Sequence, residues 1–165
     1  MTAFVFLFGL MVGSFLNCVI YRLEQGESFL KGRSYCPYCK HKLGFCDLIP
    51  VLSFIWLKGR CKYCQKKISI QYPLVELATG LLFVLNFLMF DILGMSNILF
   101  HFVIFSFLIV IFVYDLKHYI IPDKVVFSAI AISGIWYLVS GIFLNLHTKY
   151  EILDTIYSAF GAAAF

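Results

Sequence analysis

Charged side chains are scarce in this 165-residue sequence. Asp, Glu, Lys and Arg together make up 13% of the residues, whereas 62% are hydrophobic and 19% are aromatic. A soluble domain of this length would leave too much apolar surface in water, so the composition indicates that the bilayer is the solvent. The first apolar segment, residues 2–21, also has no basic residue before it. This absence argues against a cleaved secretory signal and favours a retained membrane span.

Acidic residues are fewer than basic ones, nine against thirteen, and the basic residues are concentrated in one part of the chain. Ten of the thirteen Lys and Arg residues lie between Arg22 and Lys67. Basic segments beside membrane spans stay on the cytoplasmic side. A nucleic-acid-binding patch is the alternative, but a position between two spans favours an effect on topology. We therefore expect the loop 22–73 to be cytoplasmic and the N-terminus to lie outside.

Four long apolar segments predict an all-α polytopic membrane protein. They cover residues 2–21, 74–90, 98–114 and 125–145. A fifth segment, Ile152–Phe165, stops after about fourteen residues, whereas a span needs about twenty. We therefore expect the chain to be a fragment of a longer protein. In the first segment, the small residues Gly13 and Ser14 favour a close helix contact.

Two CxxC pairs lie in the polar loop, Cys36-Pro37-Tyr38-Cys39 and Cys61-Lys62-Tyr63-Cys64, with 21 residues between them. This spacing is typical of a structural zinc site with four cysteine ligands. Cytosolic thiols stay reduced, and neighbouring Lys and Arg residues favour thiolates, which are the form that binds metal. A thiol–disulfide exchange motif remains the alternative, although it needs only one pair. Cys18 and Cys46 lie outside this pattern.

Three carboxylates lie near the ends of the predicted spans. Asp115 directly follows the apolar run 98–114, where an ionisable group costs free energy unless it is paired or hydrated. It is therefore a functional candidate, and an ordinary interfacial carboxylate is an equal alternative. Asp123 follows Pro122 and is expected to cap the next helix. Glu76 is expected to lie in the first turn of its helix, where a negative charge is favourable.

Several short motifs follow one another along the chain: Gly13-Ser14-Phe15-Leu16-Asn17 with Tyr21-Arg22-Leu23, Ser34-Tyr35-Cys36-Pro37-Tyr38-Cys39, Asp47-Leu48-Ile49-Pro50-Val51-Leu52-Ser53-Phe54, Gly59-Arg60-Cys61-Lys62-Tyr63-Cys64, Ile68-Ser69 with Tyr72-Pro73-Leu74-Val75-Glu76, and Asp115-Leu116-Lys117 with Ile121-Pro122-Asp123. In this order they closely resemble the type IV prepilin peptidases, which are membrane aspartyl proteases. The resemblance extends almost from end to end.

This resemblance implies cleavage of pilin-like precursors on the cytoplasmic side, after a glycine that precedes the hydrophobic segment. It also implies N-methylation of the new terminus with S-adenosylmethionine, although no glycine-rich nucleotide motif assigns residues to that cofactor. Asp115 would be the first of two catalytic aspartates. The second lies in a Gly-x-Gly-Asp motif that this sequence does not contain. Asp154 lacks the glycines and is expected on the outer side, so we expect the fragment to be inactive.

The sequence thus predicts three parts: a first transmembrane helix (1–21), a cytoplasmic zinc-binding loop domain (22–73) and a partial peptidase membrane core (74–165). The expected partners are type IV prepilin or pseudopilin precursors and membrane lipid, with no nucleic acid. The expected location is the bacterial inner membrane. Two other functions remain open: a membrane thiol oxidoreductase that uses a CxxC pair, and a non-enzymatic scaffold in which the zinc loop only organises the membrane part.

Overall fold

The computed structural model describes residues 1–27, 34–93, 98–120 and 122–140. In these ranges the chain forms the helices α1 (Thr2–Gln25), α2 (Leu52–Trp56), α3 (Gln71–Leu93) and α4 (Ile98–His118), and the short 3-10 helix η1 (Cys46–Leu48). A further helix follows at Asp123–Ser140. β-structure in the described ranges is limited to the isolated bridges Tyr35–Lys42 and Arg60–Lys67. The all-α prediction is confirmed.

Four helices are long and apolar enough to cross a membrane, namely Thr2–Gln25, Gln71–Met89, Ile98–His118 and Asp123–Ser140. They correspond to the four predicted spans, although α1 and α4 each continue about one turn further than predicted. Arg22, Lys117 and His118 occupy these last turns, where cationic side chains interact favourably with the helix dipole. The fifth predicted segment, Ile152–Phe165, and the end of the fourth lie outside the described residues.

Gly26 ends α1. Its backbone takes the left-handed conformation (φ 68°), which glycine adopts without a steric penalty. The N–H groups of Gly26 and Glu27 donate to the carbonyls of Leu23 and Arg22, at 3.2 and 2.9 Å. These bonds satisfy the last carbonyls of the helix and turn the chain into the cysteine-containing loop.

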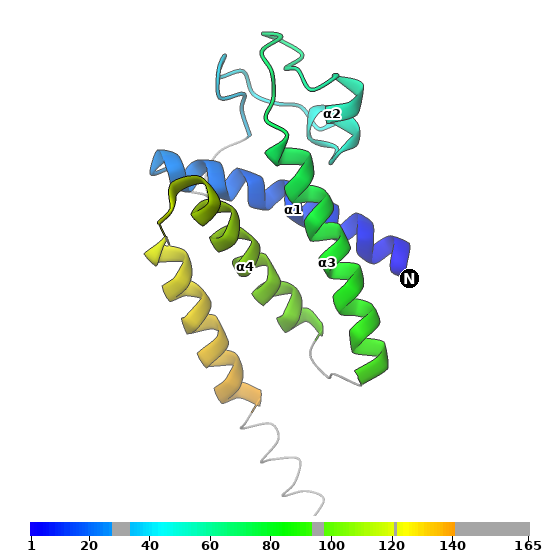
Figure 1. Cartoon of the computed structure of the whole chain (residues 1–165), viewed down its shortest axis with the longest axis vertical. Coiled ribbons are helices and arrows are strands. Elements are labelled where there is room, and N and C mark those ends of the chain that lie inside the picture. The colour runs from blue at the N-terminus through cyan, green and yellow to red at the C-terminus, as the bar shows by residue number, and fades with distance from the viewer. Residues whose placement is uncertain (28–33, 94–97, 121, 141–165) are drawn as a thin grey trace, which may run out of the picture. The chain divides into compact units, whose positions relative to one another are not determined.

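The chain divides into two compact units, Met1–Val126 and Phe127–Phe165. In the first unit α1 crosses α3, and α4 lies beside α3 (Figure 1). The hydrophobic core of this unit consists of residues from α1, α3, α4 and the following helix: Leu16, Ile20, Val75, Ile109, Val110 and Val125. Of the second unit the structure describes Phe127–Ser140, a helical segment with many exposed apolar side chains.

Small residues bring α1 and α3 into backbone contact. A Cβ atom added to Gly9 would lie 2.7 Å from the Cα of Gly80, and one added to Gly13 would lie 2.7 Å from the Cα of Glu76. The predicted close contact at Gly13 is therefore confirmed. Such approaches matter in a membrane protein, because van der Waals packing replaces the hydrophobic effect as the main attraction between helices.

Candidate functional site

The two CxxC pairs form two knuckles with the same backbone hydrogen bonds. The N–H of Cys36 donates to the carbonyl of His41 at 3.0 Å, and the N–H of Cys61 donates to that of Lys66 at 2.9 Å. In each knuckle the residue after the second cysteine has a positive φ, 57° at Lys40 and 58° at Gln65. This residue donates back to the carbonyl of the first cysteine, at 2.9 Å in both knuckles. Each four-residue motif therefore encodes one tight turn that gathers two sulfurs.

The four sulfur atoms of Cys36, Cys39, Cys61 and Cys64 come together within 4.8 Å of one another. The Sγ atoms of Cys36 and Cys64 are 3.9 Å apart. Zinc–sulfur bonds of about 2.3 Å in a tetrahedron place the sulfurs roughly 3.8 Å from one another. The donor set and its spacing therefore fit a tetrahedral metal ion. The cysteines predicted as ligands from the sequence are the ones that the fold brings together.

The electrostatics of the cluster also favour a cation. Burial alone would raise the pKa of Cys36, but backbone hydrogen bonds from Cys39 and Tyr38 lower this pKa to about 7. The backbone N–H of Lys66 favours the thiolate of Cys64, yet burial and the three neighbouring thiols raise its pKa to about 11. Adjacent thiolates repel one another, so a divalent cation would allow all four to ionise together.

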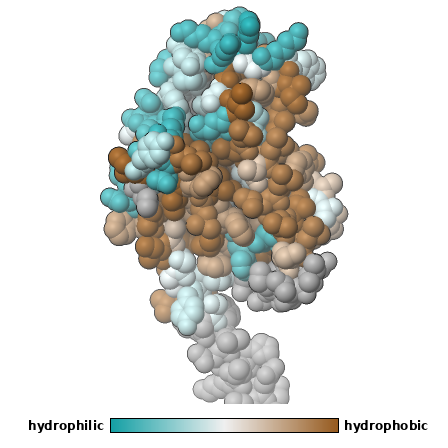
Figure 2. Space-filling view, viewed as in Figure 1, coloured by the Kyte–Doolittle hydropathy of each residue, from teal (hydrophilic) through white to brown (hydrophobic). Residues whose placement is uncertain are grey.

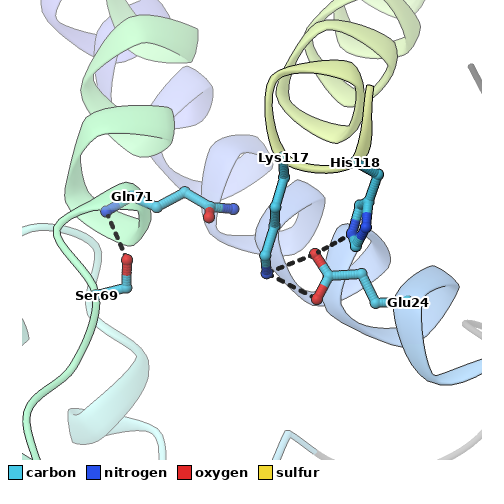
Figure 3. Close-up of polar contacts among 5 residues, drawn as sticks. All are labelled: Glu24, Ser69, Gln71, Lys117 and His118. Atoms are coloured by element: carbon cyan, nitrogen blue, oxygen red, sulfur yellow. Dashed lines mark hydrogen bonds and ion pairs between the residues drawn. The ribbon is translucent and has the colours of Figure 1, made fainter. Parts of the chain in front are cut away.

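The ends of α1 and α4 are joined by an ion pair. Glu24 on α1 accepts from Nζ of Lys117 at 2.7 and 2.8 Å, and Nε2 of His118 lies 3.4 Å from the same carboxylate (Figure 3). Gln71, the first residue of α3, lies across from this pair. The C-terminal ends of α1 and α4 and the N-terminal end of α3 therefore meet at the same end of the unit as the loop.

Asp115 lies in the last turn of α4, on an exposed position two residues before Lys117. Its backbone carbonyl accepts from the N–H of Tyr119 at 2.7 Å, which closes the helix end. Asp123 begins the next helix, but the carbonyl of Pro122 accepts its first hydrogen bonds, from Val125 and Val126. Asp123 is thus the first helical residue rather than the cap. Asp154 lies outside the described residues.

A cavity of about 430 Å³ lies between the end of α1, the loop and the start of α3. Polar side chains on its wall include those of Asn17, Arg22, Glu24, Glu76 and Lys117. The side-chain amide of Asn17 donates to the carbonyl of Tyr72 at 2.9 Å and so holds α1 to the start of α3. A volume of this size is sufficient for a small molecule or a short peptide segment.

The expectation for Glu76 is wrong. The first turn of α3 contains no acidic residue, and Glu76 lies in the second turn, 7% exposed. Its Oε2 accepts from the backbone N–H of Val51 at 2.7 Å. This hydrogen bond therefore connects the loop to α3. An acidic residue inside an apolar helix is the signal that could have identified this role, because such a group needs a partner.

Comparison with known proteins identifies the family of this chain. Residues 7–90 match the family model described as the bacterial peptidase A24 N-terminal domain. The chain belongs to this family. It is 40% identical to the prepilin leader peptidase/N-methyltransferase of Bacillus subtilis (strain 168) over 126 residues, which cover 76% of this chain and 50% of the relative. It is 37% identical to the one of Klebsiella pneumoniae over 155 residues, which cover 90% of this chain and 63% of the relative.

The relative from Myxococcus xanthus (strain DK1622) has the same name and is 52% identical over 80 residues, 48% of this chain and 24% of the relative. The chain thus spans only part of the length of the curated relatives that it matches. No solved structure matches it. The prediction that the chain resembles prepilin peptidases is confirmed, and it is a multi-pass membrane protein of that family.

Proposed function

We propose that this chain is part of a membrane aspartyl endopeptidase that removes the leader peptide of type IV prepilins or pseudopilins. The match of residues 7–90 to the A24 N-terminal domain carries this proposal. Relatives that match the chain over longer ranges are named for prepilin leader peptidase activity. The position of Asp115, at the helix end that the Glu24–Lys117 pair joins to α1, supports the same function.

In this proposal Asp115 is one of two catalytic carboxylates. A pair of carboxylates that shares one proton allows one to act as a base towards water while the other protonates the leaving amine. By resemblance, the second aspartate comes from a Gly-x-Gly-Asp motif. The basic loop favours a cytoplasmic position for this end of the helices, with the N-terminus outside and the protein in the bacterial inner membrane. A precursor would then present its leader on the side where Asp115 lies.

We further propose that the four-cysteine cluster holds one structural zinc ion. Four thiolates fill a tetrahedral coordination shell and leave no position for a reacting water. The cysteines would therefore stabilise residues 22–73 as a zinc-binding loop domain, next to the peptidase core 74–165. The relatives' names also include N-methyltransferase, which requires a methyl donor. By family resemblance this donor is S-adenosylmethionine, and the substrate is the new N-terminus of the pilin.

The test is the mass of the reaction product. The chain, extended by the C-terminal part of the Bacillus subtilis relative, is incubated with a prepilin precursor, with and without S-adenosylmethionine. We expect a precursor shortened at the leader junction in both reactions, and one added methyl group only with the cofactor. An uncleaved precursor would contradict the peptidase proposal, whereas a cleaved but unmethylated product would contradict only the methyltransferase part.

A further inference from the structure

The helix α2 exposes its large apolar side chains. Leu52, Ile55 and Trp56 are 61%, 65% and 84% exposed, and Phe45, shortly before the helix, is 88% exposed. Leu52, Ile55 and Trp56 lie at i, i+3 and i+4 of one helix and therefore share a face, and an exposed apolar face of this kind indicates an interaction surface. The helix belongs to the polar loop between α1 and α3, so lipid contact does not follow from its place in the sequence alone. The hydrogen bonds of the loop determine the position of α2.

Glu76 holds the start of α2 beside a membrane span. The carboxylate of Glu76 accepts from the N–H of Val51, the residue before α2, at 2.7 Å. Glu76 lies five residues after the first residue of α3, which corresponds to roughly 7.5 Å along the helix axis. The backbone of Glu76 also contacts Gly13 of α1. The start of α2 is therefore fixed alongside α1 and α3, near the N-terminal end of the candidate span α3.

The backbone of Val51 fixes the direction of α2 as well. Its φ of 60° is rare for a β-branched residue and sterically unfavourable. The hydrogen bond from its N–H to the carboxylate of Glu76 helps to hold this conformation. The chain turns at Val51 into α2, whose Ser53 and Phe54 line the cavity. This turn leaves Leu52, Ile55 and Trp56 on the outside.

The neighbouring charges fit a lipid surface. Lys58 and Arg60 follow α2 directly and are both exposed. Apolar side chains beside Lys and Arg are typical of helices that lie in the membrane interface, where the cations meet headgroup phosphates and Trp lies near headgroup level. Figure 2 shows hydrophobic surface over the region of α2 that continues into the hydrophobic surface over α3. This continuity favours one lipid-facing surface rather than a separate docking site.

We propose that residues 49–58 form an interfacial anchor, in which Leu52, Ile55 and Trp56 enter the boundary between headgroups and acyl chains. The partner of this surface is the bilayer in which the chain resides. The anchor would hold the cysteine loop flat against the membrane beside α3. This proposal concerns lipid contact alone and is independent of whether the chain cleaves a precursor.

Fluorescence quenching tests the anchor, because the sequence has two tryptophans, Trp56 and Trp136. The Trp136→Phe variant, reconstituted into vesicles, leaves Trp56 as the single tryptophan. We expect strong quenching by lipids brominated near the top of the acyl chain and weak quenching by aqueous iodide. Strong iodide quenching without lipid quenching would place Trp56 in water. Weak quenching by both would place it against protein. Either result would overturn the proposal.

Two further variants serve as controls. Trp56→Phe leaves Trp136, inside the candidate span Asp123–Ser140, and its quenching by brominated lipid reports correct insertion. In the Trp136→Phe background, Leu52→Ser with Ile55→Ser removes two apolar contacts of the anchor. We expect this variant to show increased iodide quenching of Trp56 and a red-shifted emission. Unchanged spectra in a variant that still inserts would contradict a role for α2 in lipid contact.

Discussion

Glu76 connects three segments of the chain, namely the loop, α3 and α1. Its carboxylate binds Val51 of the loop, its own backbone belongs to α3, and Gly13 of α1 packs against its Cα. Replacing Glu76 by Ala leaves the part-buried N–H of Val51 without this acceptor, and loss of a hydrogen bond to a carboxylate costs about 1–3 kcal/mol. We expect Glu76→Ala to lower the free energy of unfolding by that amount, measured in detergent micelles. Glu76→Gln keeps an acceptor oxygen and should lose less; equal losses in both variants would contradict this role of the hydrogen bond.

The cysteine cluster predicts a defined metal content. Protein purified without chelators should contain one zinc ion per chain, measured by elemental analysis. Cys36→Ser and Cys61→Ser should each lose it, because three thiolates and a hydroxyl do not retain zinc as four thiolates do. Cys46→Ser is the matched control, since Cys46 is an exposed cysteine of the same loop outside the cluster. A wild-type protein without zinc, and with a disulfide in either CxxC pair, would favour the thiol oxidoreductase instead.

The cysteine cluster and the contacts of Glu76 differ in how well the sequence predicts them. A CxxC motif and the residue after it determine one knuckle locally, so the spacing of two such motifs predicts the four cysteines that the fold brings together. The partner of Glu76 is 25 residues away, and the partner of Glu24, Lys117, is 93 residues away. Such pairings depend on how the helices pack, which periodicity and composition do not specify. The role of Asp115 stays a prediction.

At the scale of the helices, the contact between α1 and α3 depends on glycine. Gly9→Ala would place a methyl group 2.7 Å from the Cα of Gly80, so the two backbones must move apart. Overpacking of this kind costs about 1–3 kcal/mol, and we expect this loss in unfolding experiments in micelles. Gly134→Ala is the matched control, because a Cβ at Gly134 meets no atom within 4 Å. A loss at Gly134 as large as that at Gly9 would contradict a specific contact between α1 and α3.

The sequence also predicts the membrane helices better than the short elements between them. A long apolar run identifies a span because every backbone polar group in lipid must be satisfied within the helix. The turn at Gly26 and the helix α2 depend instead on a left-handed glycine and on the bond from Val51 to Glu76. The sequence predicts this loop as a cysteine-containing segment, and nothing in its pattern predicts the helix α2.

For the molecule as a whole, the charge distribution predicts the orientation in the membrane. Exposed Cys46 of the loop should react with an impermeant maleimide only in inside-out membrane vesicles. A cysteine introduced at Thr2, in a Cys46→Ser background, should react only in right-side-out vesicles. The reverse pattern would place the loop outside, and with it Asp115, which lies at the same end of the first unit.

Precursor processing by Asp115 variants tests the proposed catalytic role most directly. In the chain extended by the C-terminal part of the Bacillus subtilis relative, Asp115→Asn keeps the shape of the side chain but removes its ionisable group, so we expect loss of cleavage. Asp115→Glu should also abolish nearly all cleavage, because an added methylene displaces one carboxylate of a pair that shares a proton. Asp123→Asn, the control at the start of the next helix, should keep most of the activity. Full cleavage by Asp115→Asn would contradict the assignment of Asp115 as a catalytic residue.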